Sequence, residues 1–190
     1  MPSFVVGALA LTGSSLAVMG SVAGVSQGRA SRPDSGVGSL SAVEAVEVRL
    51  DDTAASAATM ALLDVEDLGP GALVDRCIRT IYRGAVDDAT IRLSGQRDGG
   101  ASIADDLAVT IEAGEGDDPA CDDFVPERAL YAARLGALWI DHPTYEDGIT
   151  VLAAAEDGDE MTVRISVLLA AGATGQPRTA RFWFLFEARP

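Results

Sequence analysis

Asp67-Leu68-Gly69-Pro70-Gly71, together with the run from Ala72 to Tyr82 that follows it, is the stretch that decides the fold. Proline presets φ for a tight turn, and the glycine on either side of it permits backbone angles that other residues resist. The run after the turn is rich in β-branched and aromatic residues, which favour strands. The stretch therefore predicts a turn that feeds a β-strand, which ends at Arg83-Gly84.

The rest of the chain repeats this pattern of short strands separated by turns. Segments in which apolar and polar residues alternate are typical of half-buried strands. The clearest of them are 46–50, 90–93, 107–112, 161–169 and 179–187. One helix is expected, from Pro126 to Trp139, where Leu130, Arg134 and Leu138 have helical spacing. Seven or more strands with one short helix predict an all-β domain over residues 46–190, an antiparallel β-sandwich or jelly roll.

The first 30 residues form an apolar leader in which no charged residue precedes Arg29. Three interpretations are open. A secretory signal peptide is favoured, because small residues at 21–23 and 28–30 suit a cleavage site. A retained membrane anchor comes second, since the apolar stretch is nearly long enough to span a bilayer. A buried helix comes third, because three glycines would weaken it.

The 190-residue chain has a formal net charge of -15, and all 14 of its basic residues are arginine. Phosphate recognition needs a basic surface, so this balance excludes nucleic acid as the expected partner. The acidity suits a chain exposed to an extracellular or salty medium, where self-repulsion keeps copies apart until a specific contact forms. We expect no membrane association once a signal peptide is removed.

Cys77 and Cys121 are the only cysteines. If the chain is exported, the compartment is oxidising and the two most simply form a disulfide. Such a bridge would close a loop of roughly 45 residues and contribute about 4 kcal/mol on the chain-entropy model. The alternative is two unpaired buried thiols. The pair lacks the Cys-x-x-Cys spacing of redox sites and the additional ligands of a zinc site.

The sequence offers little that could carry catalysis. Its single histidine, His142, lies between Asp141 and Pro143, and there is no Gly-x-Ser-x-Gly motif to supply a nucleophile. Acidic pairs such as Asp117-Asp118 and the run from Glu156 to Glu160 could bind calcium in principle, but none has EF-hand spacing and solvated turns are the simpler reading. We therefore expect no enzyme activity, no cofactor and no metal site.

The order of several motifs resembles a known family. "DLGPG" at 67–71 precedes "YRGAVDDATIRLSG" at 82–95; "CDDF" at 121–124 and "LGAL" at 135–138 follow; "FWFLFEA" closes the chain at 182–188. This order resembles the camelysin/TasA-like secreted biofilm-matrix proteins, in their high-GC Gram-positive form. The resemblance implies a secreted jelly roll at the cell surface or in the extracellular matrix. It also implies self-assembly into fibres in which each subunit donates a front strand to the next.

The resemblance makes residues 31–45 a flexible segment and a candidate donor strand. Its expected apolar contacts, continuing into the domain, are Val37, Leu40, Val43 and Val46. An extended segment that joins a sheet edge gains main-chain hydrogen bonds, while alternate side chains fill pockets. The alternative is a disordered linker. Some proteins of this family are named as metalloproteases, but this sequence has no metal-binding constellation to support that activity.

Three hypotheses about function follow. The first is a secreted structural protein whose main partner is itself, with other matrix or cell-wall components as further partners. The second is a monomeric secreted β-sandwich that binds a glycan, a protein or calcium. The third is a hydrolase whose site the sequence does not reveal. The first is preferred because architecture, and no reactive group, is what the sequence displays.

Overall fold

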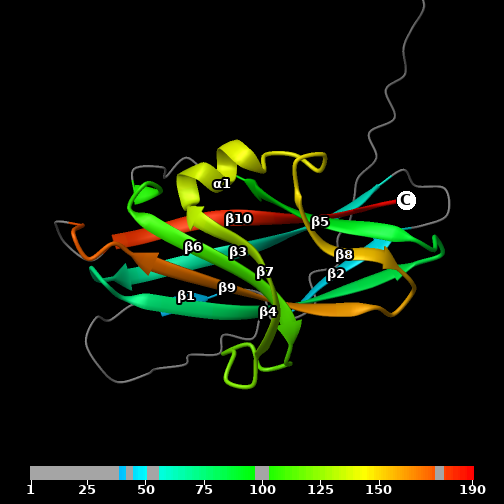
Figure 1. The fold of residues 1–190 in the computed structure, drawn as a ribbon, viewed down its shortest axis with the longest axis horizontal. Coiled ribbons are helices and arrows are strands. Elements are labelled where there is room, and N and C mark those ends of the chain that lie inside the picture. The colour runs from blue at the N-terminus through cyan, green and yellow to red at the C-terminus, as the bar shows by residue number, and fades with distance from the viewer. Residues whose placement is uncertain (1–38, 42–44, 51–55, 97–102, 174–177) are drawn as a thin grey trace, which may run out of the picture.

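The computed structural model describes residues 39–41, 45–50, 56–96, 103–173 and 178–190 (Figure 1). They form two five-stranded sheets packed face to face, with one short helix, and this confirms the expected all-β sandwich. The elements are β1 (Ser39–Ser41), β2 (Ala45–Leu50), β3 (Ala57–Leu68), β4 (Leu73–Gly84), β5 (Ala89–Gln96), β6 (Leu107–Glu115), β7 (Val125–Arg134), α1 (Leu135–Asp141), β8 (Ile149–Ala155), β9 (Glu160–Leu169) and β10 (Arg178–Arg189).

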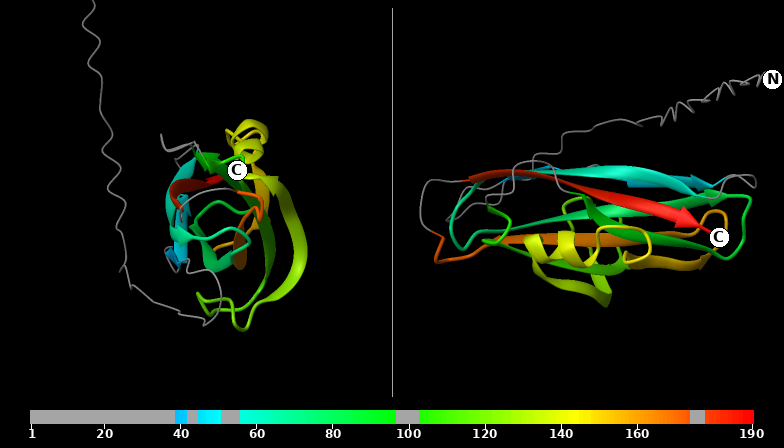
Figure 2. Two further views of the ribbon diagram at one scale, coloured as in Figure 1. Left: turned by 90° about the vertical axis from the view of Figure 1, so that its left-hand side faces the viewer. Right: turned by 90° about the horizontal axis from the view of Figure 1, so that it is seen from above.

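The strand order shows how the chain is wound. Sheet A has the order β1-β3-β10-β5-β8, and sheet B has the order β2-β4-β9-β6-β7. From β3 onward the antiparallel pairs are nested, because β3 pairs with β10, β4 with β9, β5 with β8 and β6 with β7. This nesting is compatible with the jelly roll suggested by the sequence. The two views of Figure 2 show the sheets as layers that enclose a common core.

Alternation along the strands builds that core. In β9 the side chains of Val163, Ile165 and Val167 point inward and are fully buried. From the facing sheet, β10 contributes Phe182 and Phe184, whose rings meet edge to face with their centroids 5.9 Å apart. Full burial of one such side chain contributes about 1.5–3 kcal/mol. The alternation read from the sequence therefore assigns the inner and outer faces of these strands correctly.

The Gly-Pro-Gly turn is confirmed as the entry to β4. Gly71 has a φ of 79°, in the left-handed region that favours glycine. Its N–H donates to the carbonyl of Leu169 at 2.8 Å, and the N–H of Ala72 donates to the carbonyl of Gly69 at 2.9 Å. The first bond connects the turn to the end of β9, next to the start of the β4–β9 pairing, and the second closes the turn itself.

The expected helix from Pro126 to Trp139 is wrong over most of its length. Residues Val125–Arg134 form the strand β7, and only Leu135–Asp141 is helical. The backbone of β7 completes the edge of β6, with Thr110 opposite Ala132. Hydrogen bonds to a neighbouring strand outweigh the helix propensity of this alanine-rich stretch. None of the described helices is long and apolar enough to cross a bilayer.

Candidate functional site

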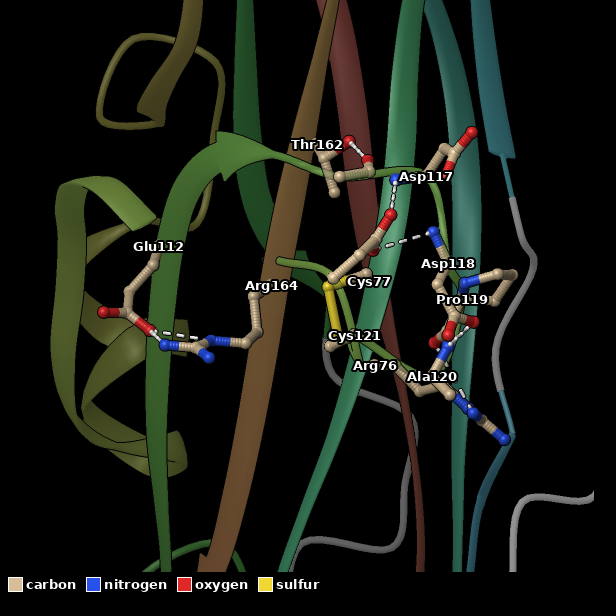
Figure 3. Close-up of a disulfide and its surroundings, with 12 residues drawn as sticks. Arg76, Cys77, Glu112, Asp117, Asp118, Pro119, Ala120, Cys121, Thr162 and Arg164 are labelled. Atoms are coloured by element: carbon tan, nitrogen blue, oxygen red, sulfur yellow. Dashed lines mark hydrogen bonds and ion pairs between the residues drawn. A yellow bond between two sulfur atoms is a disulfide. The ribbon is translucent and has the colours of Figure 1, made fainter. Parts of the chain in front are cut away.

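The disulfide expected from the sequence is present and fastens a loop onto sheet B. Cys77 in the middle of β4 is bonded to Cys121 in the β6–β7 loop, with a Cα–Cα distance of 5.2 Å (Figure 3). The N–H of Cys77 donates to the carbonyl of Pro119 at 3.2 Å, and Arg76 Nη1 donates to the same oxygen at 3.5 Å. The loop therefore covers the part of the β4 edge that β2 does not reach, since β2 pairs only from Arg79 onward.

A second group of contacts holds the same loop against the outer face of sheet B. Arg164 on β9 forms an ion pair with Glu112 on β6 (Figure 3). Its guanidinium also lies 4.6 Å from the ring centroid of Phe124. Phe124 is buried even though it lies on the outside of the sheet. The hydroxyl of Thr162 donates to the carbonyl of Gly116. The loop is thus a folded cover attached to β4 and β9.

Asp123 organises the acidic turn within this loop. Its carboxylate accepts the N–H of Asp117 at 3.2 Å and the N–H of Asp118 at 3.1 Å. These two backbone hydrogen bonds favour the ionised form and lower the pKa of Asp123 below its usual range. The carboxylate therefore closes the turn from within. Across the described part of the chain, no three His, Cys, Asp or Glu residues gather in a way that could hold a metal ion.

The candidate donor segment divides into two strands, one in each sheet. Leu40 lies in β1 opposite Val65 of β3, and Val46 lies in β2 opposite Thr80 of β4. The other two candidates, Val37 and Val43, lie outside the described residues. Val46 is only 1% exposed, so within a single chain it is part of the sandwich's own core. The structure thus places half of the predicted contacts at sheet edges of the same molecule.

β2 is held by its side chains and by one neighbouring strand. It pairs with β4 in parallel, and Val46, Val48 and Leu50 point into the core. On its other side, the hydroxyl of Thr59 donates to the carbonyl of Glu47 at 2.8 Å. Nothing in the alternation of β2 announced that its pairing would be parallel, because a strand buried on one face reads alike in either direction.

The opposite side of the sandwich ends in β7 and β8. Arg128 of β7 reaches across and donates from Nη2 to the carbonyls of Val151 at 3.0 Å and Thr150 at 3.4 Å. A charged side chain laid over an edge is a common protection against unwanted pairing. Every side chain of β7 is exposed or half-buried. Arg128, Thr59 and Arg164 were not singled out by sequence reasoning, since lone polar residues in strands carry no pattern of their own.

His142 lies in a structural position. Its ring meets that of Tyr131 edge to face, with centroids 5.3 Å apart, and Nδ1 is hydrogen-bonded to the carbonyl of Asp147. An open groove of about 490 Å³ next to α1 is lined in part by Trp139 and Asp105. Among the described residues that line this groove, Asp105 is the only carboxylate, and none is a histidine, serine, threonine or cysteine.

The features that stand out are therefore the outermost strands of the two sheets and the loop anchored by the disulfide. No protein-family model matches the chain, and a search of curated proteins finds no match to it.

Proposed function

We propose that this chain is a secreted structural protein that assembles by passing its front strands, β1 and β2, to a neighbouring copy. The observation that carries the proposal is the position of these strands. Each is the outermost strand of its sheet, and each pairs with a single neighbour. A second copy presents the same β3 and β4 edges, so every contact that the front strands make within one chain can be remade between two chains.

The energetics favour exchange over simple addition. Val48 and Leu50 are fully buried and Val46 almost so, and leaving these positions unfilled would cost several kcal/mol. The core positions that β2 fills are therefore unstable when empty, so a copy that donates its β2 must receive the β2 of another copy. Because each copy donates to one neighbour and receives from another, the contacts are head-to-tail and propagate into a fibre unless the rotation closes a ring.

Several features of the sequence support a location outside the cell. The apolar leader suits export, a disulfide suits an oxidising compartment, and the charge of -15 delays association until a specific contact forms. The resemblance to camelysin/TasA-like matrix proteins points the same way. We infer that the assembled form belongs at the cell surface or in an extracellular matrix, and that no reaction is catalysed.

The test uses a lock between β2 and β4. Arg49 and Arg83 are exposed and lie opposite each other in the parallel pair, so cysteines at both positions can be bridged. The Arg49→Cys/Arg83→Cys protein, oxidised as a monomer, should not form fibres under conditions in which the Arg49→Ser/Arg83→Ser control does. Assembly is followed by light scattering and electron microscopy.

The same variant also reports which chains are joined. Fibres grown with the engineered thiols kept free and oxidised afterwards should give a ladder of covalent oligomers on a non-reducing gel. Two results contradict the proposal: fibres that yield only monomers cross-linked within themselves, and a locked monomer that assembles as fast as the control. Monodisperse particles from the control under every condition would also overturn it.

A further inference from the structure

We propose that the segment from Val125 to Asp141 has two conformations: the strand and short helix described above, and a longer helix in which β7 leaves β6 and continues α1 toward Pro126. In the second conformation the edge of β6 is open and accepts an extended segment of a second copy. The two conformations stand on the structure alone, whereas the role of the opened edge rests on the proposed function.

The first argument is a conflict between local sequence and observed conformation. From Pro126 to Trp139 there is no valine, isoleucine or threonine, and alanine occupies positions 129, 132, 133 and 137. Alanine is the strongest helix former and is depleted in strands. Pro126 followed by Glu127 suits a first helical turn. Such a conflict between local preference and fold marks a segment whose structure depends on its neighbours.

The second argument is that β7 buries little and is held mainly by its backbone pairing with β6 and by the side chain of Arg128. Among the strands whose side chains are described, it is the one with no buried residue. It pairs with β6 alone, and that pairing slips twice, between Ile111 and Glu112 and between Ala113 and Gly114. Few buried contacts and irregular pairing are the features of segments that open locally while the rest of a domain stays folded.

The third argument is the join between β7 and α1. The helix begins at Leu135, directly after the last strand residue, and Arg134 provides no side-chain cap. At seven residues α1 is shorter than a helix that is stable by itself, so lengthening it relieves a cost. Tyr131 would then lie on the same face as Leu135 and Leu138, which are already buried, and the longer helix would keep its present attachment to the core.

The surroundings of β6 show what the change would open. β6 is bonded to β9 on one side and to β7 on the other, and its inward side chains Val109 and Ile111 are buried. Without β7, its outer row of N–H and C=O groups has no partner, which is the condition under which an edge recruits a strand. The bridge at Cys121 retains the loop in front of β7, so the release is limited to the residues beyond it.

The experiment locks β7 in place. Thr110 and Ala132 are opposite each other in the β6–β7 pair and neither is buried, so Thr110→Cys/Ala132→Cys can be oxidised to a bridge, with Thr110→Ser/Ala132→Ser as the matched control. In the control, the amide hydrogens of β7 should exchange about 100-fold faster than those of β9, through local opening. In the locked protein this difference should disappear. In the control, saturation-transfer NMR should find helical chemical shifts for Ala129 and Ala133 in the minor state.

Hydrogen exchange and NMR test the two conformations, and fibre formation tests the role of the β6 edge. Equal exchange rates in β7 and β9 of the control, or a minor state with unstructured shifts, would overturn the two conformations. If the control forms fibres and the locked protein forms them at the same rate, the β6 edge is not an acceptor. If neither forms fibres, the proposed function fails, while exchange and NMR still decide whether β7 and α1 interconvert.

Discussion

Cys77 and Cys121 are 44 residues apart in sequence, and their bond attaches the β6–β7 loop to the middle of β4. The bond lowers the conformational entropy of the unfolded chain, so removing it should lower the free energy of unfolding by about 2–4 kcal/mol. The test is urea denaturation of wild type and of Cys77→Ala/Cys121→Ala, each with and without reductant. Reductant should weaken the wild type and leave the double variant unchanged. If reductant affects both alike, or neither, the bridge does not stabilise the fold in solution.

Thr80 offers a way to strengthen the core. Its hydroxyl is completely buried on β4 and has no hydrogen-bond partner among the described residues. Thr80→Val replaces that hydroxyl with a methyl group, so it should raise the free energy of unfolding by about 1 kcal/mol. The matched control is Thr162→Val, which removes a buried hydroxyl that does donate, to Gly116, and should lower stability by about 1 kcal/mol. Changes of the same sign at both positions would contradict this account.

Gly114 on β6 lies directly against the start of β7. A Cβ atom at this position would lie 2.1 Å from the carbonyl oxygen of Val125, which belongs to the backbone and cannot turn away. Gly114→Ala should therefore cost about 1–3 kcal/mol, as overpacking does. Gly172→Ala is the control, since no atom of the described residues lies within 4 Å of its added methyl group, and we expect no loss of stability there. Thermal unfolding of the two variants measures the difference, and equal melting temperatures would refute the contact.

Asp123 should make the loop sensitive to acid. Its pKa in the folded protein is lowered by the N–H groups of Asp117 and Asp118, so the ionised carboxylate stabilises the folded state. This contribution is fully present above the unfolded pKa of about 4 and is lost as the pH falls through the lower folded value. Asp123→Asn should therefore be less stable than wild type at pH 6, and the gap should narrow on acidification below about pH 4.

The measurement for Asp123 is urea unfolding at a series of pH values. Asp122→Asn removes one charge from the same loop and controls for the change in net charge. A stability gap between Asp123→Asn and wild type that is constant from pH 6 to pH 2 would mean that the carboxylate does not act through its ionisation.

The sequence was sufficient where a strand is buried on one face. Alternation identified Val46–Leu50 and the phenylalanines of β10, and the structure places these side chains in the core. The sequence-based prediction was wrong at β7, because the local pattern of alanine and leucine contains no information about the pairing of this segment with β6. The direction of strand pairing could not be predicted either, since the parallel pairing of β2 with β4 depends on the path of the chain between the two strands.

The candidate site divides in the same way. The cysteine pair followed from the number of cysteines and the expected compartment, and the bond is present. The side chains that protect edges or hold the loop, Arg128 and Arg164 among them, act across strands that are distant in sequence. Which sheet edges are covered by the chain itself depends on the order of the strands in the sheets. A local sequence pattern does not contain that order.

The nested pairing has a consequence for how the protein is made. β10, the last strand, lies in the interior of sheet A between β3 and β5, with Ala188 opposite Ala57. Most contacts therefore join residues that are far apart in the sequence, which makes folding slow. β10 must be synthesised before sheet A can close, so the newly made polypeptide stays accessible to chaperones and proteases until then.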